Sequence, residues 1–127
     1  MTDTAPARSE VSFELENGSQ RGLRFDFNTI VEVEEALGGK AFTQLAAQLA
    51  SGLVSFRDLR VLAQKGLNSY ALQHGSKKKV VSLAEAGDIV QELGLQQFTE
   101  LMQTAIVSAF PEAGEDDEAS ESVEEGK

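Results

Sequence analysis

Apolar residues occupy every second position in two short segments near the start of the chain, residues 11–15 and 23–27. A period of two predicts strands with one buried face, because successive side chains of a strand point to opposite sides. Asn17-Gly18-Ser19 lies between the segments, and Asn and Gly tolerate the positive φ that a tight hairpin turn needs. We therefore predict an antiparallel hairpin with a shared apolar face, formed by Val11, Phe13, Leu15, Leu23, Phe25 and Phe27.

The apolar spacing becomes helical from residue 28 onward. It predicts a first helix that Asn28 or Thr29 caps and that Gly38-Gly39 ends, since Gly takes the left-handed conformation at a helix C-terminus without a steric penalty. A second helix is predicted from Ala41 to Ser51-Gly52. The residues expected to face the core are Ile30, Val33, Ala36 and Leu37 in the first helix and Phe42, Leu45, Ala46 and Leu49 in the second.

Two further helices are predicted from their capping residues. Ser55 can accept a hydrogen bond from the first turn of a third helix, and Asp58 places a carboxylate at its positive end. Ser82 and Glu85 have the spacing of a capping box and predict the start of a fourth helix, whereas residues 66–81 are irregular and predict a connection. The expected apolar faces are Phe56, Leu59, Leu62, Ala63 and Leu67 in the third helix and Leu83, Ala86, Ile89, Val90 and Leu93 in the fourth.

The longest apolar stripe of the chain follows Gly94, which is expected to end the fourth helix. It predicts a fifth helix that ends before Pro111. Two interpretations remain open for this stripe, the central helix of the core or a surface for a partner helix or a second copy of the chain. Its residues are Leu95, Phe98, Leu101, Met102, Ala105, Ile106, Ala109 and Phe110.

The charge of the chain is unevenly distributed. The 127 residues carry a formal charge of −10, but residues 112–127 alone account for −7, with eight carboxylates against Lys127. That segment has too little apolar surface to offset its ordering entropy, so we predict a disordered acidic tail over 111–127 and a disordered N-terminus over 1–9. Residues 10–110 are expected to form one small α+β domain, predominantly helical, with the hairpin packed on about five short helices.

Composition excludes several classes of protein. The chain has no Cys and one His, so it has no disulfide framework, no thiolate nucleophile and no zinc ribbon. No apolar run approaches the roughly 20 residues that cross a bilayer, and the polar start lacks the features of a signal peptide, so we expect a protein of the cytoplasm without membrane contact. Net acidity opposes attraction to phosphate backbones, which makes nucleic acid an unfavourable partner.

Local patterns suggest little catalytic chemistry. His74 lies beside a glycine in the predicted connection, where a solvated loop residue is a better interpretation than a general base. Glu32, Glu34 and Glu35 lack a His or Asp at metal-ligand spacing. We therefore predict a protein that is not an enzyme, with no catalytic, cofactor-binding or metal-binding residues and no cofactor.

Two basic segments resemble phosphate-binding patterns only in part. Gly38-Gly39-Lys40 lacks the upstream Gly and the following Ser or Thr of a phosphate-binding loop, and a glycine helix stop explains the same residues. Lys77-Lys78-Lys79 could touch phosphate, but the segment lacks aromatic platforms and is better explained as a solvated loop.

The order of these segments resembles a known family. A hairpin leads through Arg24-Phe25-Asp26-Phe27-Asn28 into the helix Ile30–Gly38, a stretch at Leu53–Leu59 then opens a helix that ends near Gly66-Leu67, and the last helix is amphipathic. This arrangement over residues 11–110 is similar to the tail-assembly-chaperone group of gene-transfer-agent and phage tail proteins. The acidic tail is a departure that the resemblance does not explain.

The resemblance implies a phage or prophage tail morphogenesis protein that acts in the bacterial host cell. We expect a tail assembly chaperone that binds the tape-measure protein, or other tail proteins, through apolar helix faces, and that can form homo-oligomers. A structural component of the virion tail is the alternative, and a small regulatory protein that uses its acidic tail is a second alternative. The candidate partner-binding residues are Phe56, Leu59, Leu62, Phe98, Leu101, Met102, Ala105, Ile106 and Phe110.

Overall fold

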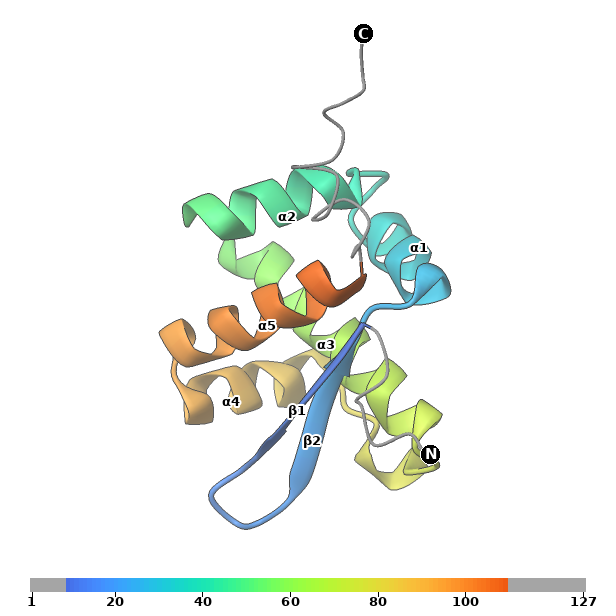
Figure 1. Cartoon of the computed structure of the whole chain (residues 1–127), viewed down its shortest axis with the longest axis vertical. Coiled ribbons are helices and arrows are strands. Elements are labelled where there is room, and N and C mark those ends of the chain that lie inside the picture. Colours follow the sequence, from blue (N-terminus) through green and yellow to red (C-terminus); the bar gives the residue numbers. More distant parts are fainter. Residues whose placement is uncertain (1–8, 110–127) are drawn as a thin grey trace, which may run out of the picture.

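The computed structural model of the chain describes residues 9–109, so the predicted tail over 111–127 and most of the predicted N-terminal segment lie outside the described residues (Figure 1). Two antiparallel strands and five α-helices form an α+β domain that is mostly helical, as predicted. The elements are β1 (Glu10–Glu14), β2 (Gln20–Arg24), α1 (Phe27–Ala36), α2 (Phe42–Ser51), α3 (Phe56–Gln73), the short 3₁₀ helix η1 (Lys77–Lys79), α4 (Leu83–Leu93) and α5 (Leu95–Ala109).

The hairpin forms at the predicted turn. Gly18 has a φ of +84°, and the Ser19 amide donates a 2.8 Å hydrogen bond to the Asn17 side chain. Val11 pairs with Leu23 across the two strands. The hairpin is also anchored just before β1, because the Phe25 amide donates to the Ser9 carbonyl and Ser9 is buried, although we predicted that residue 9 lies outside the domain.

The start of α1 corrects two predictions. Asp26, rather than Asn28 or Thr29, caps the helix, and its carboxylate accepts a 2.9 Å hydrogen bond from the Thr29 amide. Partial burial opposes ionisation of Asp26, but its hydrogen bonds from Thr29 and the charge of Arg24 outweigh burial and lower its pKa. Because the helix begins immediately after this cap, Phe27 leaves the strand pattern and is 78% exposed, whereas Phe25 is buried.

The longest helix, α3, lies at the centre of the domain against β2, α4 and α1 (Figure 1). It continues to Gln73, so the predicted connection from residue 66 is wrong over residues 66–73. Gly66 does not end the helix because it serves packing instead. A Cβ atom there would lie 2.7 Å from Phe25 Cζ, so only glycine lets the buried ring approach the helix backbone this closely.

The connection from α3 to α4 is ordered by side chains of α3. Asn68 forms two hydrogen bonds with the backbone of Val81, one from its Nδ2 to the carbonyl oxygen at 3.1 Å and one to its Oδ1 from the amide at 2.7 Å. Ser82 and Glu85 then form the predicted capping box, with both reciprocal hydrogen bonds present. Gly94, with a φ of +95°, separates α4 from α5 as predicted.

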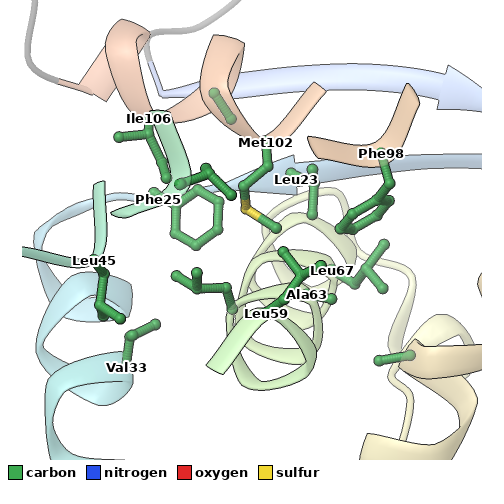
Figure 2. Packing of buried hydrophobic residues seen from close by; sticks show 14 of the residues in the cluster. Leu23, Phe25, Val33, Leu45, Leu59, Ala63, Leu67, Phe98, Met102 and Ile106 are labelled. Carbon is green, nitrogen blue, oxygen red and sulfur yellow. The ribbon is translucent and has the colours of Figure 1, made fainter. Parts of the chain in front are cut away.

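The core lies between α3, α5, the inner face of the hairpin and the α1–α2 pair (Figure 2). Phe98 and Met102 extend from α5 toward α3 and β2, while Val33 and Leu45 close the side formed by α1 and α2. Several positions predicted to face the core are instead exposed, because they lie at helix ends or on the edge of an apolar stripe: Phe27, Ala36, Phe56, Leu83 and Leu95.

Candidate functional site

Most of the predicted partner-binding residues belong to the core. Six of them are buried in the chain's own hydrophobic cluster, so in this conformation five present no surface to a partner and only Leu59 borders an open groove (Figure 2). The physical reason is that the apolar stripe of α5 covers α3 and the hairpin. Leu101 is half-buried against the same cluster and Phe110 lies outside the described residues. The six are Leu59, Leu62, Phe98, Met102, Ala105 and Ile106.

Phe56 is the exception, because 74% of its surface is exposed. It is the first residue of α3, directly after the Ser55 cap, whose hydroxyl accepts a 3.0 Å hydrogen bond from the Asp58 amide. This cap fixes the direction in which the helix begins. Phe56 is thereby held at the outer end of α3, and Leu53 in the preceding connection is 75% exposed.

Phe56 lies at one end of an open groove of about 510 Å³ between α3 and α4, which we call the α3–α4 groove. The two helices meet where Asn68 contacts Val81, and Phe56 and Leu95 line the groove at its other end. Both helices contribute residues at the spacing i, i+3, i+4, so that one side-chain row from each forms a wall. The lining residues are Phe56, Leu59 and Arg60 from α3, Gly87, Val90 and Gln91 from α4, and Leu95 from α5.

Gly87 keeps the groove open. It is an interior helix position where glycine costs about 1 kcal/mol relative to alanine, and no positive φ at this position requires it. A Cβ atom at Gly87 would lie 3.6 Å from Arg60 Cδ, which is ordinary van der Waals contact. The alkyl part of Arg60 thus lies over the space that a larger residue at position 87 would fill, and Arg60 is the one ionisable side chain of the lining.

A buried ion pair holds the N-terminal half of α3 in place. Asp58 is 1% exposed, and its Oδ2 accepts a 2.6 Å hydrogen bond from Lys40 Nζ in the α1–α2 connection. The hydrogen bond from Lys40 lowers the pKa of Asp58 despite the opposing effect of burial. Lys40 is therefore a structural partner of α3, and Gly38 and Gly39 have positive φ values in the helix stop that precedes it.

The other sequence candidates also have structural partners. His74 caps the C-terminal end of α3, stacks on Tyr70 with 4.3 Å between ring centroids and shares Glu10 with Arg24. Glu34 accepts a 2.7 Å hydrogen bond from the Phe42 amide at the start of α2. Within the part of the chain that the structure describes, no group of three or more His, Asp or Glu residues could hold a metal ion.

The sequence predicts the part of the groove that α3 forms but not the part that α4 forms. It named Phe56 and Leu59 as candidate contacts, but it gave no role to Arg60, Gly87 or Gln91. The sequence signal for the missed part is Gly87, a glycine in the interior of a predicted helix, next to the apolar residues Ala86, Ile89 and Val90.

None of the helices over residues 9–109 combines the length and the apolar character that spanning a membrane requires. Comparisons with protein-family models, with curated proteins and with solved structures found no match.

Proposed function

We propose that the protein is a non-enzymatic tail assembly chaperone that binds an apolar helical segment of a tape-measure protein in the α3–α4 groove. The observation that carries the proposal is an open groove between two helices, at which a large aromatic side chain is held exposed. The resemblance of residues 11–110 to tail assembly chaperones supplies the kind of partner. A third helix laid between α3 and α4 would bury the exposed ring of Phe56.

The charge of the groove indicates which helical segments fit best. Arg60 is the one ionisable residue among the lining, in a chain whose net charge is −10. An apolar stripe flanked by a carboxylate would therefore gain a rim contact with the guanidinium, and such a contact affects specificity and association rate more than affinity.

The energetics favour reversible binding. Full burial of a Phe or Leu side chain contributes about 1.5–3 kcal/mol, and Phe56 and Leu95 are already partly buried before binding. These two contacts alone cannot offset the roughly 4–15 kcal/mol that association costs, so the partner must bury further residues along the groove. A weak and extended contact suits a chaperone that is displaced when tube subunits polymerise.

The strand content also supports a chaperone over a tube subunit. Tube proteins form continuous sheets around a lumen, whereas residues 9–109 contain two strands that pair only with each other. A structural role in the tail remains the competing function, and composition of finished particles separates the two.

Co-expression with a tape-measure protein from the same genome tests the proposal. We expect the chain to keep the tape-measure protein soluble and to be absent from purified tails. Phe56→Ser should reduce co-purification of the tape-measure protein at least about tenfold, which corresponds to the loss of one buried aromatic contact. Phe27→Ser is the matched control, because Phe27 is also the first residue of a helix and equally exposed, but lies outside the groove.

A second variant blocks the groove without removing a contact. Gly87→Leu adds a side chain beside Arg60 and should abolish co-purification while the fold is retained. Retention of the chain in purified tails would favour the structural role, and equal loss of binding in Phe56→Ser and Phe27→Ser would reject the groove as the site.

A further inference from the structure

We propose that a second, smaller cavity binds an oxyanion such as a phosphate group, through Arg21 and Lys79. The cavity measures about 140 Å³ and lies between β2, the C-terminal part of α3 and η1, apart from the α3–α4 groove. We call it the Arg21 pocket. Its lining is formed by Gln20, Arg21, Gly22, Leu67, Tyr70, Ala71, His74, Ser76 and Lys79.

The two cations are each held by a backbone carbonyl of the opposite segment. Arg21 Nη1 donates a 2.6 Å hydrogen bond to the Lys79 carbonyl, and Lys79 Nζ donates a 2.7 Å hydrogen bond to the Gln20 carbonyl. These two bonds join β2 to η1 and fix both charged groups beside the cavity. The site is therefore preorganised, and binding would require little further ordering of two long side chains.

Both cations keep donors that the protein does not use. A guanidinium has five N–H groups and an ammonium has three, whereas each side chain here makes a single hydrogen bond. Arg21 Nε is buried and has no hydrogen-bond partner. Arg21 and Lys79 both line the cavity, and their unused N–H groups are the donors from which an oxyanion in the Arg21 pocket would accept hydrogen bonds.

The surrounding charge favours an anion. The lining includes Arg21 and Lys79 but no carboxylate, and neither cation has an ion-pair partner within residues 9–109. Glu10 contacts His74 and forms an ion pair with Arg24, and Glu14 lies opposite Gln20 across the strand pair. Lys77 and Lys78 on η1 add positive charge beside the site.

One feature of the fold opposes anion binding. The helix α3 ends at Gln73, next to the cavity, and helix C-termini carry partial negative charge. This effect is reduced because the carbonyl groups of Tyr70, Ala71 and Leu72 already accept hydrogen bonds from the amides of residues 74–76. Two full positive charges outweigh a partial negative charge that is largely hydrogen-bonded.

The size of the cavity suits a small ligand. A volume of about 140 Å³ accommodates one tetrahedral ion with four oxygens, and the open side of the cavity leaves room for a group attached to it. Tyr70 closes the apolar side, and its pKa is raised by burial and by the charge of Glu10, so its hydroxyl stays protonated at neutral pH. The pocket therefore suits a single phosphate group, either free or carried as a monoester.

Titration of the full chain with inorganic phosphate at constant ionic strength tests the proposal, with amide chemical shifts as the readout. We expect saturating shifts at Gly22, Ser76 and Lys79, and a rise of the thermal midpoint with phosphate that chloride does not reproduce. A parallel titration with methyl phosphate separates the two sources, since tighter binding of the ester indicates a phosphate group carried on a larger molecule.

Three variants locate the site. Arg21→Gln and Lys79→Met should each weaken phosphate binding by roughly tenfold or more, because each removes a charge-assisted hydrogen bond. Lys78→Met removes the same charge from a neighbouring residue that does not line the cavity, and should change the affinity by less than about threefold. Shifts that do not saturate, equal effects of chloride, or equal loss in Lys78→Met and Lys79→Met would overturn the proposal.

Discussion

The two halves of α3 are packed in opposite ways. The C-terminal half lies tightly against β2, where glycines bring backbone and ring into contact: a Cβ atom at Gly66 would clash with Phe25, and one at Gly22 would overlap the Tyr70 ring. The N-terminal half borders the open α3–α4 groove and is held by the Lys40–Asp58 ion pair. Glycine therefore allows close packing between α3 and β2, whereas Gly87 leaves open space between α3 and α4.

This difference shows that the effect of a glycine inside a helix depends on what lies opposite it. At Gly66 the missing side chain is replaced by a buried aromatic ring, so the close approach contributes to stability. At Gly87 the missing side chain leaves open space, so glycine lowers the stability of the helix but gives the surface a concave shape. The following predictions test this contrast.

Loss of a leucine should cost more where α3 is fully enclosed by the core than where it borders the α3–α4 groove. Leu62→Ala leaves an enclosed cavity, because Leu62 is completely buried, and we expect the free energy of unfolding to fall by about 3–5 kcal/mol. Leu59→Ala lies beside the α3–α4 groove, where water can enter the vacated space, so we expect about 2–3 kcal/mol. Urea denaturation of both variants measures the difference, and equal losses would contradict the contrast.

The ion pair between Lys40 and Asp58 should make the free energy of unfolding depend on pH. Because the pKa of Asp58 is lower in the folded protein than its ordinary value of 3.8, the stabilisation is complete above pH 3.8 and is lost as the pH falls through the folded-state value. Asp58→Asn should lower the free energy of unfolding at pH 7 by about 1–3 kcal/mol, less than for a fully buried pair because Lys40 can reach water.

The loss in Asp58→Asn should shrink when denaturation is repeated at progressively lower pH. Asp88→Asn on the exposed surface of α4 is the control, and we expect it to change stability by less than about 0.5 kcal/mol. A loss that is the same at pH 7 and at pH 3 would show that the charge of Asp58 does not hold α3.

Alanine at Gly66 should destabilise the domain. The substitution gains about 1 kcal/mol of helix propensity, but the new methyl group would lie 2.7 Å from Phe25 Cζ, and overpacking typically costs 1–3 kcal/mol. We expect the free energy of unfolding to fall by up to about 2 kcal/mol, measured as a lower midpoint of thermal denaturation. A higher stability of Gly66→Ala would mean that the hairpin can move away from α3 without losing stabilising contacts.

Alanine at Gly87 should have the smallest effect and the opposite sign. Its methyl group would contact only Arg60 Cδ at 3.6 Å, so the gain in helix propensity of up to about 1 kcal/mol is retained. The same variant should bind the partner less well, because the floor of the groove rises. A destabilised Gly87→Ala protein would contradict the interpretation of position 87 as open surface.

Local signals in the sequence predicted much of the fold. The period of two, the Asn17-Gly18 turn, the Ser82–Glu85 capping box and the Gly94 break all depend on residues close in sequence, and each is confirmed. Predictions failed where a distant segment decided the outcome. The irregular pattern from Gly66 onward predicts a connection, whereas the role of Gly66 inside α3 depends on Phe25, 41 residues away.

The candidate site was less predictable for the same reason. An apolar stripe looks alike in a sequence whether it faces the core or a partner, and only burial by other elements separates Phe98, which is in the core, from Phe56, which is exposed. The Arg21 pocket depends on a contact between Arg21 on β2 and Lys79, 58 positions later. Taken by itself, the run Lys77-Lys78-Lys79 indicates only a solvated loop.

The contact between Ser9 and Ser108 has a consequence for synthesis of the chain. The Ser9 amide donates a 2.7 Å hydrogen bond to the Ser108 hydroxyl, and α5 covers β1 with residues that leave the ribosome almost a hundred positions later. The hairpin is therefore made first but stays uncovered until α3 and then α5 have been translated, and folding depends on contacts of high sequence separation. A nascent chain arrested at Gly94 would lack the cover that α5 gives to Leu23 and Phe25, and this apolar surface would be open to the chaperones of the cell that makes it.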